Sequence, residues 1–319
     1  MRIFIAISLF LTFQFLSAQP DSLFIKSKKD KFNVPKWVQK NKAGLDISEV
    51  AFVNWNAGGS NSISALVSLV SSLNYSYKHF YWNNDGVIRY GVNKQEEQKL
   101  RKTEDVIELN SNLGFRKDTL TNWFYSARFN FRTQFMNGYN YPDRDNPISR
   151  FMAPGYLFVG GGVEHKLPNK KGAFYFSPVT VKATFVLDED LANAGSFGVE
   201  PAVYDDFGNL LSEGQRIRNE VGILLTNAYE TKIIENIYVK NQLSLYTDYI
   251  NSFGNVDVDW LINFDFKVNN YVKASLGSHL KYDDDVKTLV ATDIPDEFEE
   301  RGAKIQWKQL LGVGVVVDF

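Results

Sequence analysis

The stretch VDVDWLINFDFKV, residues 256–268, decides the fold. Apolar side chains occupy every second position from Val256 to Val268, and most of the positions between them carry Asp, Asn or Lys. Successive side chains of a β-strand point to opposite faces, so the stretch predicts a strand with one apolar and one polar face. The polar face must meet water or a partner, and the apolar face of a transmembrane barrel strand meets lipid.

Other parts of the chain repeat this alternation. Residues 63–77 place mostly Ile, Val, Leu and Tyr on one face and mostly Ser and Asn on the other, and residues 123–135 place Trp, Tyr and Phe opposite polar residues that include Arg128 and Arg132. The chain therefore predicts an all-β protein, a single transmembrane antiparallel up-and-down β-barrel of about 12 strands. The expected strands cover residues 44–52, 62–77, 80–94, 104–117, 123–139, 156–167, 173–187, 216–233, 236–250, 256–269, 271–283 and 305–319.

The connections between the expected strands alternate in length. Short ones cover residues 78–79, 118–122, 168–172, 234–235 and 269–270, whereas long ones, rich in Gly, Pro, Asn and Asp, include residues 139–154, 188–215 and 284–304. Outer-membrane barrels have short periplasmic turns and longer extracellular loops. This asymmetry is independent of the alternation, and it predicts an outer-membrane barrel whose amino terminus is periplasmic.

Both ends of the chain have features of an exported membrane protein. Arg2, an apolar run and small residues ending at Ala18 predict a signal peptide over residues 1–18, cleaved near Ala18. A periplasmic amino-terminal segment is expected over residues 19–43, and the outer-membrane β-barrel over residues 44–319. The lysines of residues 26–42 suit either a flexible tether attracted to anionic headgroups or a docking arm. A terminal residue such as Phe319, closing an alternating strand, resembles the signal that the outer-membrane assembly machinery recognises.

The composition argues against several classes of protein. The formal net charge is −2, with 35 Lys and Arg against 37 Asp and Glu, and no basic patch of the kind that binds nucleic acid stands out. The absence of Cys argues against a lipid-anchored cysteine, disulfides and thiolate metal sites. Aromatic residues make up 15% of the chain, which fits the aromatic belts of a barrel. We expect no cofactor.

Several blocks of the sequence resemble one family. FVNWNAGGSNS, residues 52–62, resembles the NWxAGGxNS element near the start of a Bacteroidota-type outer-membrane β-barrel family of unassigned function. Further blocks look like those of that family in its order: KTED at 102–105, GYNYP at 138–142, LANAGSFGV at 191–199, YDDD at 282–285, and the final strand with its terminal Phe. The resemblance covers roughly residues 37–319. It implies a barrel made by one domain, with no catalytic residues to carry over.

The polar faces of the expected strands supply the candidate lumen residues. Charges of both signs occur there, which suits either a narrow aqueous pore or a lumen closed by paired charges and loops. The candidates for lining the lumen or setting its selectivity are Arg116, Arg128, Arg132, Arg218, Glu220, Asp257, Asp259, Asp265, Lys267, Lys273, His279 and Lys281.

Two connections hold candidate contact or ligand residues. Residues 54–62 suit a tight loop folded into the barrel mouth, or a constriction or partner contact built from Asn54, Trp55, Asn56, Gly58 and Gly59. The connection over residues 188–215 carries several Asp and Glu and neither Lys nor Arg. Oxygen-rich loops can hold calcium, but the spacing lacks a full calcium-loop signature. We therefore expect a solvated acidic loop and no metal.

The three histidines do not form a catalytic pattern. His79 falls in an expected turn, His165 near a strand end and His279 on the lumen face. Ser278 points to the opposite face of its strand, and a nucleophile needs its base within hydrogen-bond reach. We therefore expect a protein that is not an enzyme, with a barrel hydrolase as the minor alternative.

The sequence leaves two functions open. One is a channel or transport-like barrel for small solutes, in which lumen charges set the selectivity. The other is a non-enzymatic accessory subunit of an outer-membrane export or assembly complex, docked through its loops and basic amino-terminal segment. Both imply contact with outer-membrane lipid and lipopolysaccharide and with the assembly machinery during insertion. The second also implies an envelope protein complex, and neither implies nucleic acid.

Overall fold

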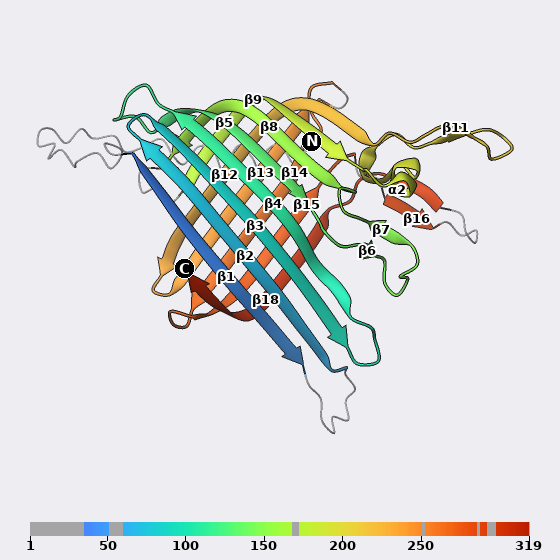
Figure 1. Cartoon of the computed structure of the whole chain (residues 1–319), viewed down its shortest axis with the longest axis horizontal. Coiled ribbons are helices and arrows are strands. Elements are labelled where there is room, and N and C mark those ends of the chain that lie inside the picture. Colours follow the sequence, from blue (N-terminus) through green and yellow to red (C-terminus); the bar gives the residue numbers. More distant parts are fainter. Residues whose placement is uncertain are drawn as a thin grey trace, which may run out of the picture.

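Twelve antiparallel strands close into one β-barrel (Figure 1). The computed structural model describes residues 35–50, 60–167, 172–250, 253–285, 288–291 and 298–318. The barrel closes where β1 (Lys36–Val50) pairs with β18 (Gln306–Asp318), with Leu45 opposite Val315. The prediction of an all-β, antiparallel up-and-down barrel of about 12 strands is confirmed.

The other barrel strands lie close to the predicted ranges. They are β2 (Ser62–Tyr77), β3 (Phe80–Gln95), β4 (Arg101–Phe115), β5 (Trp123–Thr133), β8 (Gly155–Lys166), β9 (Gly172–Phe185), β12 (Ile217–Ile234), β13 (Ile237–Asp248), β14 (Asp257–Lys267) and β15 (Val272–Tyr282).

The first strand is longer than the sequence pattern predicts. β1 begins at Lys36 rather than near residue 44, and its pairing with β2 continues to Lys36 opposite Ser76. On its outer face, the Trp37 ring lies 4.9 Å from the Tyr75 ring and 5.9 Å from the Trp82 ring, between ring centroids. Residues 36–43, expected in the amino-terminal segment, therefore form part of the barrel wall, where aromatic packing and strand pairing hold them.

The short connections lie at one end of the barrel and the long connections lie at the other. At the short-turn end, where β1 begins and β18 ends, consecutive strands are joined by short turns, such as Lys78 and His79 between β2 and β3. At the long-loop end, three of the connections contain small elements of their own. These elements are β6 (Gly138–Tyr139), β7 (Pro147–Ser149), helix α2 (Glu189–Asn193), the 3-10 turn η1 (Ser196–Gly198), β10 (Val203–Tyr204), β11 (Leu210–Ser212), β16 (Thr288–Ala291) and β17 (Phe298–Arg301).

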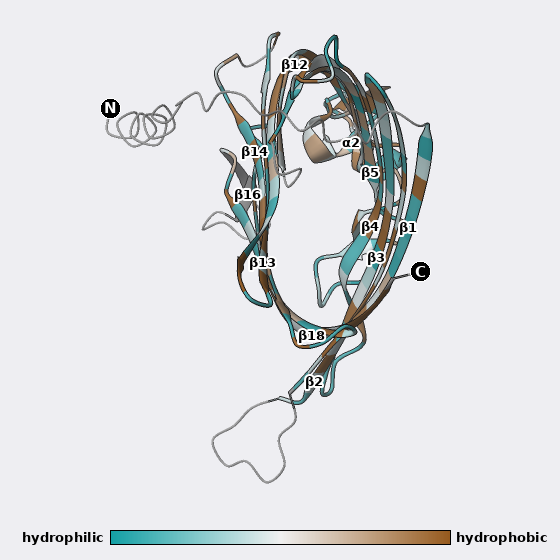
Figure 2. Cartoon of the chain, turned by 90° about the vertical axis from the view of Figure 1, so that its left-hand side faces the viewer, coloured by the Kyte–Doolittle hydropathy of each residue, from teal (hydrophilic) through white to brown (hydrophobic). Residues whose placement is uncertain are grey.

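The outer face of the barrel is apolar and exposed. Figure 2 shows hydrophobic and hydrophilic residues interleaved along the strands, as alternation requires. Outward side chains such as Ile63, Ile88 and Val313 keep between 47% and 55% of their surface accessible. Monomeric soluble proteins rarely expose contiguous apolar surface on this scale. Exposed aromatic rings, including Trp123 and Tyr125, lie on this face near the short-turn end.

The connection between β9 and β12 packs onto the long-loop end. Helix α2 begins after Asp188, whose carboxylate accepts a hydrogen bond from the Leu191 backbone N–H at 3.2 Å. Leu191 and Val199 are buried with Ala153 and Val186 in one apolar cluster. This cluster fixes the start of the connection against the end of the neighbouring strands. Among the described residues, no helix is long and apolar enough to cross a membrane.

Some predicted features lie outside the described residues. They are the signal peptide over residues 1–18, the amino-terminal segment up to residue 34, the terminal Phe319, and the loop candidates Asn54, Trp55, Asn56, Gly58 and Gly59. These features stay predictions.

Candidate functional site in the lumen

The inner face of the barrel brings most of the lumen candidates together. Strand pairing places them on the face opposite the apolar outer residues, as for Arg132 of β5, which lies beside Glu108 of β4. The candidates on this inner face are Arg128, Arg132, Arg218, Glu220, Asp257, Asp259, Asp265, Lys267, Lys273, His279 and Lys281.

Arg116 lies apart from this set. It follows the end of β4, where its guanidinium donates hydrogen bonds to the carbonyl oxygens of Thr121 at 3.2 Å and Lys78 at 3.4 Å. The same guanidinium lies 5.5 Å from the centre of the Phe124 ring. These contacts tie neighbouring turns of the short-turn end together, which is a structural role.

A first cluster of charges centres on Glu164 of β8. Its carboxylate accepts a hydrogen bond from Arg128 at 2.7 Å, and Lys166 lies 3.5 Å away. Arg128 also donates to the Thr226 hydroxyl at 2.8 Å, and Thr226 belongs to β12, three strands away around the barrel. The guanidinium stacks 3.9 Å above the Tyr175 ring. Side chains therefore bridge this part of the lumen between strands that are not neighbours.

A second cluster centres on Lys182 of β9 towards the long-loop end. Its ammonium lies 2.8 Å from Asp257, 3.3 Å from Glu220 and 3.6 Å from Asp283. Lys182 is 4% exposed, so three carboxylates compensate one buried cation. These partners come from β12, from β14 and from the chain just after β15.

Arg218 connects this second cluster to the long connection above it. Its guanidinium lies 2.7 Å from Asp285 and 3.5 Å from Glu220, and it donates to the Gly198 carbonyl oxygen at 3.0 Å. Gly198 ends η1, so the middle of the acidic connection is anchored to charges at the barrel mouth. The sequence predicts a solvated acidic loop, and acidic side chains such as Glu189 and Asp190 are exposed, whereas the backbone at Gly198 is held against the barrel.

Two further carboxylates of β14 are paired along the wall. Asp265 lies 3.0 Å from Lys240 and 3.9 Å from Lys273. Asp259 lies 2.7 Å from the His279 Nε2 and 3.2 Å from Lys281. Lys267, at the end of β14, has no ion pair within the described part of the chain.

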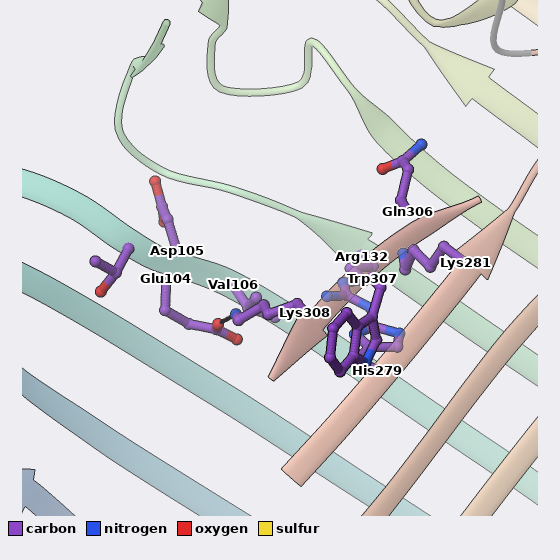
Figure 3. A pocket seen from close by; sticks show the side chains of 10 residues that line it. Glu104, Asp105, Val106, Arg132, His279, Lys281, Gln306, Trp307 and Lys308 are labelled. Carbon is purple, nitrogen blue, oxygen red and sulfur yellow. Dashed lines mark hydrogen bonds and ion pairs between the residues drawn. The ribbon is translucent and has the colours of Figure 1, made fainter. Parts of the chain in front are cut away.

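A cavity of about 350 Å³ opens inside the barrel between β4 and β5 on one side and β15 and β18 on the other (Figure 3). Lys308 of β18 forms an ion pair with Glu104 of β4, and Arg89 lies 3.3 Å from the same carboxylate. β4 and β18 are separated by β3, β2 and β1 in the closed sheet. The Lys308–Glu104 pair therefore crosses the lumen. The cavity is lined by Thr103, Glu104, Asp105, Val106, Arg132, His279, Lys281, Gln306, Trp307 and Lys308.

The histidines and Ser278 are arranged as the sequence suggests. His279 faces the lumen, whereas the Ser278 hydroxyl accepts a hydrogen bond from the Trp307 indole at 2.9 Å on the outer face. The His165 ring packs against the outward Trp123 ring, with 4.7 Å between centroids. The His79 Nδ1 lies 2.9 Å from the Arg116 carbonyl oxygen. None of these described contacts pairs a histidine with a serine.

Several members of these clusters were not among the predicted site residues. They are Arg89, Glu104, Glu164 and Lys308, and all lie on inner faces of strands that the alternation predicts. The signal available in the sequence was whether each residue occupies an inward or an outward position in the alternation of its strand. The alternation assigns each side chain to a face of the sheet but not to a position along the barrel axis. It therefore cannot show which charged side chains are in contact.

Comparison with known families adds a partial match. Residues 47–139 match the family described as "Protein of unknown function (DUF3078)". The match covers the first part of the barrel and assigns no activity. No curated protein matches the chain in sequence.

Similar solved structures are barrels of the bacterial outer membrane. An outer-membrane channel from Pseudomonas putida F1 is 10% identical, with a TM-score of 0.41, over 95% of this chain and 100% of the other. The translocator domain of the autotransporter NalP from Neisseria meningitidis is 9% identical, with a TM-score of 0.34, over 88% of this chain and 87% of the other. The β domain of the Bordetella autotransporter BrkA is 9% identical, with a TM-score of 0.33, over 89% and 98%. At this distance their functions do not transfer.

Proposed function

We propose that this protein is an outer-membrane barrel that passes small polar solutes through its charged lumen. The observation that carries the proposal is the division of the wall into an apolar exposed outer face and an inner face that surrounds a charged cavity of about 350 Å³. The proposal includes a periplasmic short-turn end, export by the predicted signal peptide, and outer-membrane lipid and lipopolysaccharide around the barrel.

The outer face supports the membrane location. A closed barrel satisfies its backbone hydrogen bonds between strands and leaves no open edge, which is the condition for a sheet to span a bilayer. Exposed side chains such as Leu69, Leu109 and Val159 would be costly in water but match hydrocarbon. The aromatic rings near the short-turn end, including Trp37 and Trp82, fit the interfacial girdle of such barrels.

The inner face supports passage of solutes. Ion pairs within the lumen join strands that lie apart in the sheet, as in Lys182 with Asp257 and Lys308 with Glu104. Rings of charged side chains set selectivity in many pores. The pairs occupy only part of the interior, because the cavity between β4 and β18 remains beside them.

Reconstitution into planar bilayers tests the proposal. The folded protein is expected to give stepwise currents in potassium chloride. Combining Glu104→Gln with Lys308→Gln removes the ion pair that crosses the lumen and is expected to change the size of the steps. Glu235→Gln, in the exposed turn between β12 and β13, is the matched control and is expected to leave the currents unchanged. Correctly folded protein that carries no current would refute passage.

A second candidate function is an accessory subunit of an envelope complex. The β10–β11 hairpin favours it, because the hairpin projects from the long-loop end (Figure 1) and exposes apolar side chains. Phe207 is 90% exposed and Leu211 66%. Asp205 in the same hairpin accepts hydrogen bonds from the Asn209 side chain and from backbone N–H groups, which hold the pKa of its carboxyl below the usual value. The hairpin thus suits a protein partner with apolar and basic side chains.

A further inference from the structure

The charges around the lumen cavity are unequally matched. Glu104 has two cationic partners, Arg89 and Lys308. Asp105 is held by the Lys102 ammonium at 2.9 Å and also accepts hydrogen bonds from backbone N–H groups at Phe135 and Met136. Both acidic residues of the lining are therefore engaged already and are poor partners for any further cation.

Arg132 is a cation of the cavity lining that lacks a close carboxylate partner. Within the described part of the chain, its guanidinium forms neither an ion pair nor a hydrogen bond. Its neighbour across the β4–β5 pairing is Glu108. The Glu108 carboxylate instead accepts hydrogen bonds from the side chains of Asn110 at 2.9 Å and Asn130 at 3.3 Å. A guanidinium offers five N–H donors in a planar fork, so this one has unused capacity inside the lumen.

Other basic groups that line the cavity reinforce a positive potential. Arg132, His279 and Lys281 line the same cavity, and Figure 3 labels all three. The Asp259 carboxylate is shared between His279 and Lys281. One carboxylate is therefore paired with two basic side chains, and it reaches Arg132 only through a longer-range electrostatic interaction.

We infer that the Arg132 side of this cavity binds small dissolved anions that carry carboxylate or phosphate groups. The planar guanidinium matches the two oxygens of such a group, and Lys281 and Lys308 add positive charge nearby. The inference deepens the proposed passage of solutes and rests on it, because it makes Arg132 the residue that gives the lumen its preference for anions.

Three substitutions separate the role of Arg132 from general effects of charge. Arg132→Gln removes both the positive charge and the planar guanidinium. Arg132→Lys keeps the charge but removes the planar guanidinium. Lys94→Gln removes one positive charge from the exposed outer face of β3 and is the matched control. Heat-dependent migration on gels verifies that each variant forms the folded barrel before it is measured.

The first measurement is the reversal potential across a bilayer with a potassium chloride gradient. The unmodified protein is expected to prefer chloride over potassium. Arg132→Gln is expected to lower that preference several-fold, Arg132→Lys to lower it less, and Lys94→Gln to leave it unchanged. A wild-type preference for cations, or an Arg132→Gln variant identical to wild type, would overturn the inference and leave the proposed passage intact.

The second measurement is calorimetric binding of succinate and of inorganic phosphate in a maltoside detergent that contains no phosphate. Arg132→Gln is expected to weaken binding about tenfold or more, because it removes a hydrogen bond to a charged group. Because the detergent has no phosphate, any binding is of the dissolved anion rather than of a lipid headgroup. Protein that carries no current but binds succinate through Arg132 would refute passage and keep the site. Absence of binding by either anion would refute the site.

Discussion

At the scale of single residues, Glu164 balances the positive charges of the first lumen cluster. It is 1% exposed and neutralises both Arg128 and Lys166 while accepting a hydrogen bond from the Asn112 amide at 2.9 Å. Removing one partner of a buried ion pair leaves the other charge uncompensated, which costs far more than the pair itself contributes.

Glu164→Gln is therefore expected to lower the free energy of unfolding by about 2–4 kcal/mol, towards the lower end because Arg128 and Lys166 are partly accessible to water. Urea titration in detergent, followed by the loss of barrel migration on gels, measures this change. Glu235→Gln removes an equal charge from an exposed turn and is expected to shift the free energy by less than about 0.5 kcal/mol. Equal stability of the two variants would show that Glu164 does not hold the cluster together.

At the scale of elements, the β10–β11 hairpin separates the two candidate functions. Combining Phe207→Ser with Leu211→Ser removes its two most exposed apolar side chains. If the hairpin docks a partner subunit, native gels of gently solubilised membranes should show the wild-type protein in a larger complex and the double variant as a free barrel.

Ile250→Ser provides the matched control for that comparison. Ile250 is 72% exposed in the connection between β13 and β14, at the same end of the barrel. It is expected to leave the complex intact. Wild-type protein that migrates as a free barrel under these conditions would rule out the accessory role.

The elements also show how far the sequence could predict the fold. Period-two alternation located the barrel strands because one face of each meets an apolar environment along most of its length. It failed at β1, where Lys36, Lys40 and Lys42 were assigned to the amino-terminal segment although they alternate with residues that include Trp37. The α2 helix was missed as well, although Asp188 followed by Glu189 and Asp190 is a typical helix start.

At the scale of the whole molecule, barrel closure creates the site. Lys308 and Glu104 are 204 residues apart in sequence, and they meet because β1 and β18 join the two ends of the sheet. Alternation predicts that both side chains point inward, but their contact depends on the stagger and flattening of the closed barrel. The fold was therefore predictable from local pattern, whereas the ion pairs that cross the lumen were not.

The central claim is that one face of every barrel strand meets lipid and the other meets a wet lumen. The chain contains no Cys, so single cysteines can be placed one at a time along β14, from position 258 to position 265. In reconstituted liposomes, a hydrophilic maleimide should label cysteines at the inward positions 259, 263 and 265 and spare those at the outward positions 258, 260, 262 and 264. Labelling that ignores this alternation, or that favours the apolar positions, would contradict the account.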